Sequence, residues 1–156
     1  MRQILYILLG LFLTIKVYCQ SNYIDPTGTY ELDSKTEKKG EDIFGYSGKI
    51  QVKKIKQDKI IMTFMICKGA PSYNSGSFVD TLDYNKNTVI YKTLDFDPSC
   101  LIKFDFNNKG IFVKETTNDL NSGCGFGHAV VADGFFKKTS SSEPLLKDPM
   151  TDEEIQ

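Results

Sequence analysis

The sequence predicts an all-β fold, in which an antiparallel meander of about eight strands forms a small barrel. Short runs of residues alternate between apolar and polar side chains, which is the period-two pattern of half-buried strands. The connectors between most of these runs are short and rich in Asn, Asp and Gly, and no helical periodicity separates them. A two-sheet β-sandwich is the alternative fold for the same pattern.

The chain opens with a segment typical of a cleaved signal helix, residues 1–19. Arg2 supplies a positive start, Ile4–Ile15 is an almost unbroken apolar run, and a polar stretch begins at Gln20. The apolar run is too short to span a bilayer comfortably as a permanent helix. We therefore expect a secreted or periplasmic protein that meets the membrane only through its signal peptide before cleavage.

Two other fates of the N-terminal segment stay open. Cys19 ends the apolar run and would be the lipidated residue of a bacterial lipoprotein, but Lys16 and Tyr18 stand where that signal has a Leu-like and a small residue. A retained anchor is the other alternative. Cleavage after Cys19 is the prediction.

The composition indicates one domain and argues against nucleic-acid binding. Removal of residues 1–19 leaves about 137 residues, enough for one core over residues 20–138. It also removes Arg2 and Lys16 and lowers the net charge from −1 to about −3. Because phosphate binding needs several clustered cations, and the densest group here flanks a turn, we expect no nucleic-acid partner.

Each predicted strand follows from its own alternation. The clearest is Cys100–Phe106, where Cys100, Ile102, Phe104 and Phe106 face one side of the sheet. The other predicted strands are Thr27–Asp33, Tyr46–Lys56, Lys59–Cys67, Ser77–Tyr84, Thr88–Leu94, Gly110–Glu115 and Ala129–Lys138.

Three segments do not follow the alternating pattern. Ile60–Cys67 is apolar on both faces, so its outer face needs cover from a loop or terminus, or else forms a partner-binding patch. Ser34–Gly45 is a charged connector that we expect to be mobile. Residues 139–156 are rich in Ser, Pro and acidic side chains, and they predict a disordered acidic tail.

Three cysteines remain after cleavage, and in an exported chain this number indicates one disulfide and one free thiol. Cys100 begins a strand and Cys124 lies in a glycine-rich loop, so both are at element ends where sulfur atoms meet without distorting a ladder. We predict a Cys100–Cys124 disulfide and expect Cys67 to be buried as a small apolar residue. Pairings of Cys67 with either of the others, or no disulfide, are the alternatives.

The sequence offers little that indicates catalysis. His128 is the one histidine, and a Cys124–His128 nucleophile is excluded if Cys124 is in a disulfide. Asp95 and Asp97 lack the regularly spaced oxygen ligands of a calcium loop, and a turn that Asp97 stabilises before Pro98 is the preferred interpretation. We therefore predict no enzyme, no metal site and no cofactor.

Two segments and the overall layout resemble known families. The segment Cys124–Lys138, with its Cys-Gly turn and Ala-Asp-Gly-aromatic strand, is similar to the closing segment of small exported bacterial proteins. Thr27–Leu32 resembles the Gly-x-aromatic first strand of lipocalin-like barrels. A signal peptide, about eight strands, a disulfide and a protruding loop resemble the layout of periplasmic lysozyme inhibitors, whose Ser-Gly loop near a Tyr has a counterpart of different order in Ser72–Gly76.

The functional hypothesis is an exported, non-catalytic binding module that engages a protein partner or a small apolar ligand. The candidate contact loops are Lys68–Gly76 and Ser122–His128, and the candidate contact residues are Tyr73, Phe126 and His128. The alternatives are an inhibitor of a cell-wall hydrolase such as lysozyme, which the resemblance implies, and a structural component of an envelope assembly.

Overall fold

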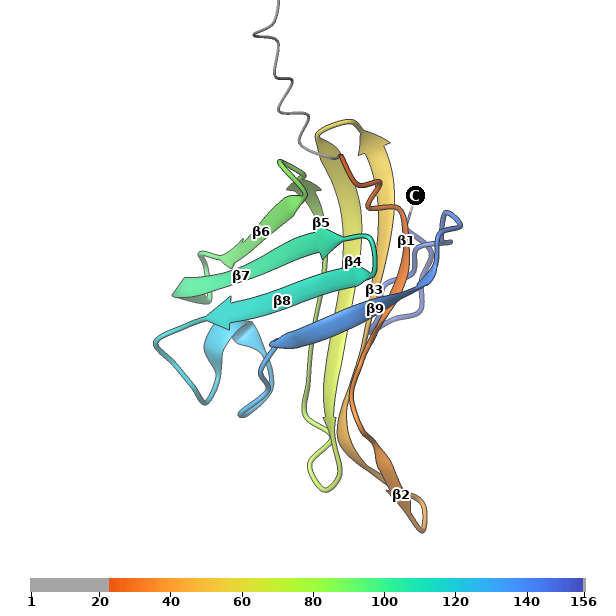
Figure 1. The fold of residues 1–156 in the computed structure, drawn as a ribbon. Coiled ribbons are helices and arrows are strands. Elements are labelled where there is room, and N and C mark those ends of the chain that lie inside the picture. Colours follow the sequence, from red (N-terminus) through yellow and green to blue (C-terminus); the bar gives the residue numbers. More distant parts are fainter. Residues whose placement is uncertain (1–22, 156) are drawn as a thin grey trace, which may run out of the picture.

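The structure is a computed structural model that describes residues 23–155, so the predicted leader and the lipidation alternative at Cys19 lie outside the described residues. The described chain is all-β with one short 3₁₀-helix (Figure 1). Its elements are β1 (Gly28–Leu32), β2 (Glu37–Lys39), β3 (Asp42–Lys56), β4 (Lys59–Gly69), β5 (Ser75–Asp83), β6 (Thr88–Thr93), β7 (Asp97–Asn107), β8 (Gly110–Thr116), η1 (Gly123–Gly125) and β9 (Gly134–Ser140). Over residues 23–155, no helix has the length and apolar character needed to cross a bilayer.

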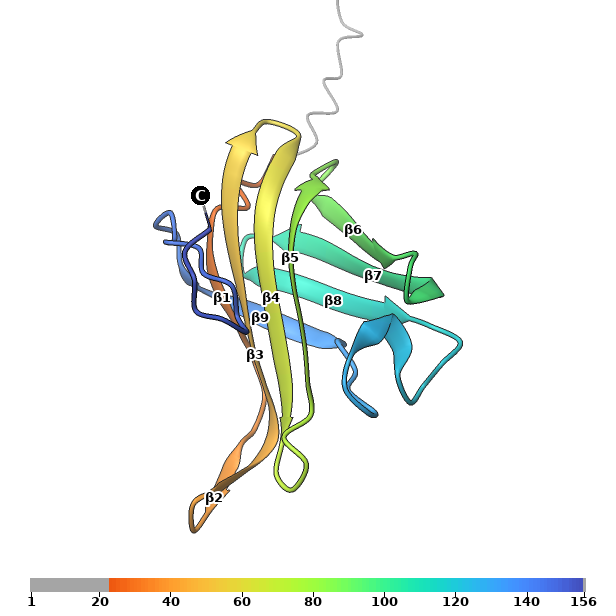
Figure 2. The same ribbon diagram turned by 180° about the vertical axis from the view of Figure 1, so that it is seen from behind.

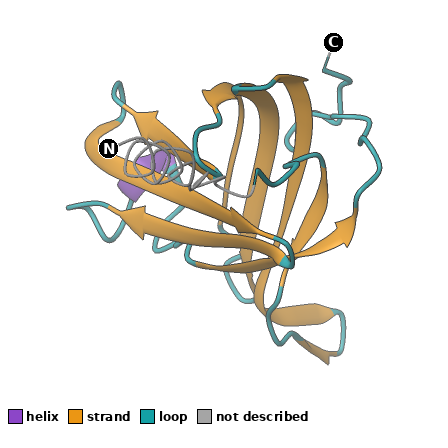
Figure 3. Cartoon of the chain, turned by 45° about the horizontal axis from the view of Figure 1, so that its top comes forward, coloured by secondary structure: helices purple, strands orange, loops and turns teal. Residues whose placement is uncertain are grey.

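The strands form one antiparallel sheet that curls into a nearly closed barrel, as predicted (Figure 3). Strand order in the sheet is β5-β4-β3-β1-β9-β8-β7-β6, with β2 paired to β3. Each main strand therefore lies next to its neighbours in sequence, and β1 pairs with β9 to join the two ends of the meander. The exception is the boundary between β5 and β6, two consecutive strands that do not form a ladder.

Two parts of the strand prediction need correction. The segment Ser34–Gly45 was expected to be a connector, but β2 and the start of β3 pair as a hairpin that projects from the barrel (Figure 1). Gly40 has φ +66° in the turn of this hairpin, a conformation that glycine adopts at little cost. The last strand begins at Gly134 instead of Ala129, because residues 129–133 are held by loop contacts described below.

Aromatic side chains fill the interior of the barrel. Phe64 of β4 is fully buried, and its ring centroid lies 5.3 to 5.9 Å from those of Phe78, Phe104, Phe126 and Phe136. Along β4, side chains of one face enter this core, as the alternation predicts. The interior is a packed core, and this arrangement does not favour a ligand inside the barrel.

The C-terminal segment is ordered in this structure, in contrast to the expected disordered tail over residues 139–156. Leu146 is only 3% exposed, and the segment folds back on itself through backbone bonds between Asp148 and Glu153 and between Ile155 and Leu146. Glu143 also pairs with Lys53 at 2.9 Å. The prediction of disorder was based on the low apolar content of the segment. One buried leucine, Leu146, together with these backbone bonds, holds the segment in place.

This segment also supplies cover for the outer face of β4. Thr63 points away from the core side chains Met62 and Phe64 and is nevertheless buried. A pocket of about 340 Å³ is lined both by Thr63 and Met65 and by residues of the C-terminal segment, Leu145 and Pro149 among them. Figure 2 shows the segment against the outside of the sheet. Cover by a terminus, the first of the two expectations for this face, therefore applies to this part of it.

Candidate functional site

The disulfide lies at one end of the barrel, where three loops meet. Cys100 and Cys124 are bonded, with their Cα atoms 5.1 Å apart, which confirms the predicted pairing. Within residues 23–155, Cys67 is the free cysteine and is partly exposed, so the expected full burial is not observed. Its Sγ lies 3.9 Å from the carbonyl oxygen of Tyr73.

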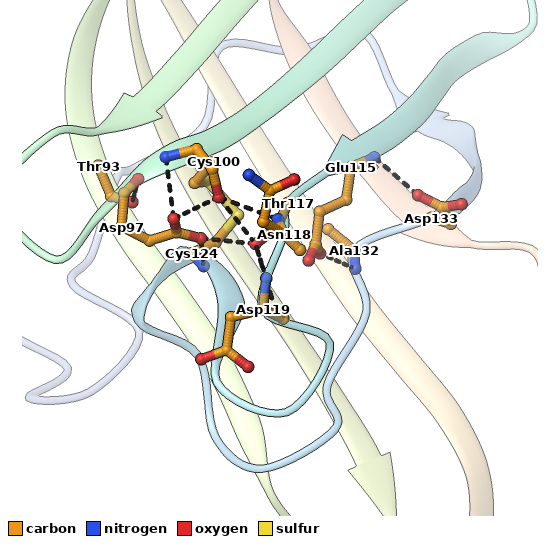
Figure 4. The surroundings of a disulfide bond; sticks show 11 residues. Thr93, Asp97, Cys100, Glu115, Thr117, Asn118, Asp119, Cys124, Ala132 and Asp133 are labelled. Carbon is orange, nitrogen blue, oxygen red and sulfur yellow. Dashed lines mark hydrogen bonds between the residues drawn. A yellow bond between two sulfur atoms is a disulfide. The ribbon is translucent and has the colours of Figure 1, made fainter.

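The carboxylate of Asp97 holds the loops around the disulfide together (Figure 4). It accepts hydrogen bonds from the hydroxyl and the backbone N–H of Ser99, at 2.6 and 2.9 Å. It also accepts from the Thr117 hydroxyl at 2.6 Å and from the Cys124 N–H at 3.2 Å. These bonds, from Ser99 and Thr117 first, lower the pKa of Asp97 to about 2, because they stabilise the charged form.

The pKa of Asp97 predicts how this end of the barrel responds to acid. A group whose pKa is lower in the folded state stabilises the fold above its unfolded pKa of about 4, and that contribution is lost as the pH falls towards 2. We expect Asp97→Asn to lower the free energy of unfolding at pH 7, and the difference from the wild type to shrink between pH 4 and pH 2. Urea unfolding across pH 2–7 measures this, with exposed Asp95→Asn in the same turn as the control. A difference that stays constant through this range would contradict the assignment.

The structure brings the two predicted contact loops together. The side-chain amide of Asn74 donates to the backbone carbonyl of His128 at 3.0 Å, and the Gly127 N–H donates to the Ser75 carbonyl at 2.9 Å. The Tyr46 hydroxyl donates to the carbonyl of Ala129 at 3.0 Å and so fixes the end of the second loop to β3. Lys68–Gly76 and Ser122–His128 therefore form one continuous end of the molecule.

Tyr73 lies at the outer margin of this end and is 45% exposed. Its hydroxyl donates to Asp42 at 2.9 Å and accepts from the Ile43 N–H at 3.2 Å. These two bonds connect the β4–β5 loop to the β2–β3 hairpin. Tyr73 is thus partly exposed to a partner while its hydroxyl is bonded to the hairpin.

Phe126 was predicted to be a contact residue, but it lies in the core instead of on the surface. It is 6% exposed and its ring stacks on Phe64 in the core. A Cβ atom placed on Gly76 would lie 2.3 Å from the Phe126 ring, so glycine at position 76 leaves the space that the ring occupies. Phe126 therefore anchors the Ser122–His128 loop to the core of the barrel.

His128 is exposed, as expected for a contact residue. Within residues 23–155, no hydrogen bond or ion pair joins its side chain to Asp95, Asp97 or Asp133. Asp133 instead accepts from the Glu115 N–H at 2.7 Å and pairs with Lys114. Asp133 is therefore bonded to β8 and not to His128.

A buried carboxylate, Glu115, fixes the other side of the same loop. It accepts the Ala132 N–H at 2.8 Å, and burial raises its pKa while this bond acts in the opposite direction. The position of Glu115 explains why residues 129–133 do not join the last strand: their backbone bonds go to Glu115, Tyr46 and Asn121. Its role is to position the loop.

The structure adds three exposed apolar residues that the sequence interpretation missed. Phe96 is 84% exposed, Leu120 78% and Leu94 67%. Leu94 and Phe96 lie in the β6–β7 turn just before Asp97, and a Cβ atom placed on Gly125 would lie 3.6 Å from the Phe96 ring. Leu120 lies in the loop that Thr117 connects to Asp97. We call Leu94, Phe96, Leu120, Tyr73 and His128 together the contact surface.

Comparisons with protein-family models, with curated proteins and with solved structures gave no match.

Proposed function

We propose that this protein is an exported, non-catalytic binding module that engages a protein partner through the contact surface. The observation that carries the proposal is the exposure of Phe96, Leu94 and Leu120 on loops held by a disulfide and by Asp97. Aromatic and aliphatic side chains concentrate binding energy when a partner buries them, and a rigid scaffold lowers the entropic cost of binding. The packed interior supports a protein partner over a small apolar ligand in the barrel.

Export is supported by two independent features. Disulfides persist in oxidising compartments, and the Cys100–Cys124 pair forms one here. The apolar N-terminal segment in the sequence has the pattern of an export signal, which agrees with the presence of a disulfide. The proposed location is therefore the periplasm or the extracellular space.

The test compares two variants that lose the same kind of exposed apolar surface. We expect a Leu94→Ser, Phe96→Ser, Leu120→Ser variant to bind a partner captured by the wild type at least tenfold more weakly, because these side chains would be buried in the complex. The control is Phe112→Ser, since Phe112 is 58% exposed on β8 and outside the contact surface. Affinity is measured by biolayer interferometry. Equal binding by the triple variant would contradict the proposed surface.

The residues chosen from the sequence are tested in the same assay. Tyr73→Ala and His128→Ala are each expected to weaken binding, and Tyr73→Phe separates the ring from the hydroxyl that holds Asp42. If the ring makes the contact, Tyr73→Phe retains binding and Tyr73→Ala does not. Loss of binding in both variants would show that Tyr73 acts through its hydroxyl, by positioning the β2–β3 hairpin, and not through direct contact of its ring.

Inhibition of a cell-wall hydrolase is a narrower version of this function. It is favoured by the β2–β3 hairpin, which projects from the barrel beside the β4–β5 loop and Tyr73 and is long enough to enter a cleft (Figure 1). Micromolar protein added to lysozymes of several types would slow their turnover if this version is right. Unchanged turnover of every lysozyme would contradict the inhibitor version and would not affect the broader proposal of a binding module.

A further inference from the structure

The boundary between β5 and β6 is the one place in the described barrel where two main strands face each other without a ladder. The strands share the turn at Asn85–Thr88 and diverge from it (Figures 1 and 2). At the turn end of this boundary lies a groove of about 610 Å³, lined from β5 by Thr81 and Asp83 and from β6 by Ile90 and Lys92. We call the whole unpaired boundary between β5 and β6, with this groove at one end, the seam.

The hydrogen-bond pattern shows which backbone groups of β5 face the seam. Tyr84 donates its N–H to Asp58 and Asn74 gives its carbonyl to Lys68, so the even-numbered residues of β5 bond to the β4 side. In an antiparallel pair, the alternate residues direct both backbone groups to the other edge. The residues whose groups face the seam are therefore Ser75, Ser77, Val79, Thr81 and Asp83.

The same argument applies to β6. Asn87 gives its carbonyl to Phe106 of β7, so the alternate residues Thr88, Ile90 and Lys92 face the seam. Thr88 exchanges both backbone bonds with Asn85 at the turn. At the other end of β5, Ser75 accepts from Gly127. Between these closed ends, the edge groups of Ser77 and Val79 on β5, and of Ile90 on β6, have no backbone partner within residues 23–155.

Asp80 makes the seam favour a positively charged partner. It is opposite Met62 in the ladder, on the same face as the core residues Phe78 and Leu82, yet it is exposed because the barrel is open here. Its carboxylate bends over the edge and accepts the Thr81 N–H at 2.7 Å. It forms no salt bridge with a lysine of the described chain. An inward-facing charge on an edge strand repels apolar and acidic strands from that edge.

Aromatic rings lie next to this carboxylate. Phe78 of β5 and Tyr91 of β6 stack across the seam, with centroids 3.8 Å apart and planes 6° apart. Asp80 acts on Tyr91, since its negative charge and burial of the phenol both raise the pKa of Tyr91, with burial the larger cause. Phe78 is buried and Tyr91 is partly exposed, and a carboxylate beside such an aromatic pair is a suitable environment for a lysine or arginine side chain.

From these contacts we infer that the seam is a strand-addition site, which accepts an extended peptide segment carrying a Lys or Arg at the level of Asp80. The segment pairs its backbone with the free edge groups of Ser77, Val79 and Thr81, and β6 forms the second wall. A carbonyl of the segment takes over the Thr81 N–H, which frees Asp80 to pair with the cation. The site is distinct from the contact surface at the disulfide end and does not depend on it.

The probe is a fluorescein-labelled nine-residue peptide of alternating Thr and Val with one central Lys, acetylated and amidated at its ends. Two matched peptides carry Glu in place of Lys, or N-methyl groups on alternate central amides. Binding to the full chain, expressed with its own leader and purified, is measured by fluorescence anisotropy. We expect the Lys peptide to bind at least tenfold more tightly than either matched peptide.

Variants of the protein test the role of Asp80 directly. Asp80→Lys should reverse the preference, so that the Glu peptide binds more tightly than the Lys peptide. Asp80→Asn, a smaller change, should remove the preference if Asp80→Lys fails to fold by circular dichroism. Glu41→Lys on the exposed β2–β3 hairpin makes the same charge change away from the seam and should leave the preference intact.

Four outcomes would overturn the inference. They are no binding of the Lys peptide to the wild type at millimolar concentration, full binding of the N-methylated peptide, an unchanged preference in both Asp80 variants, and a wild-type dimer in sedimentation that Asp80→Lys dissociates. The last would assign the seam to a second copy of this chain.

Discussion

Phe64→Ala is expected to lower the free energy of unfolding by about 3–5 kcal/mol, the range found when a large buried aromatic is truncated. Phe64 is fully buried at the centre of the barrel, and four aromatic rings surround it. Truncation removes the apolar surface of the ring and leaves a cavity whose walls come from several strands and from the η1 loop. Because these walls come from hydrogen-bonded strands of one sheet and from a disulfide-linked loop, they cannot collapse far enough to fill it. Urea or guanidinium unfolding, followed by circular dichroism, measures the loss.

The control removes an equal side chain from the surface. Phe112 on β8 is 58% exposed, with its ring 4.6 Å from that of Phe135, so Phe112→Ala should cost about 1 kcal/mol or less. Phe64→Leu keeps most of the buried volume and should fall between the two alanine variants. Equal losses from Phe64→Ala and Phe112→Ala would show that the interior is not packed around Phe64.

The regular part of the fold follows from local patterns in the sequence. Along Cys100–Phe106, the strict alternation of apolar and polar side chains is enough to predict a strand and to predict which of its side chains face the core. The pairing of Cys100 with Cys124 is also predictable, because Cys100 lies near the start of a strand and Cys124 in a glycine-rich loop. The β2 strand was not predictable in this way, since its charged residues carry no apolar alternation.

The site was harder to predict, because direction within a loop depends on its neighbours. Phe126 enters the core through the space that Gly76 leaves, and no local feature of the glycine-rich loop reveals that space. Phe96 lies between Asp95 and Asp97 in the predicted turn, and a large aromatic side chain on such a short connector was the available signal. Asp80 carried a clearer one: a charged residue in the inward phase between Phe78 and Leu82 indicates a strand edge that is not fully covered.

Replacement of both disulfide cysteines, Cys100→Ala with Cys124→Ala, is expected to lower the free energy of unfolding by about 3 kcal/mol, within a measured range of about 2–5. The bond closes a loop with a sequence separation of 24 residues, which restricts the unfolded chain. It also joins β7 to the loop that carries Phe126 and His128, so the same variant should bind a partner of the contact surface more weakly. Denaturant unfolding and interferometry measure the two effects on one sample.

Cys67→Ala provides the matched control, since it removes a thiol outside any disulfide. We expect its unfolding free energy to stay within about 1 kcal/mol of the wild type, because Cys67 is only partly buried. Treatment of the wild type with a reductant should reproduce the behaviour of the double variant and should leave the double variant itself unchanged. If Cys67→Ala destabilised the protein as much as the double variant does, the stabilising bond would involve Cys67, and the placement of the η1 loop over β7 would have to be abandoned.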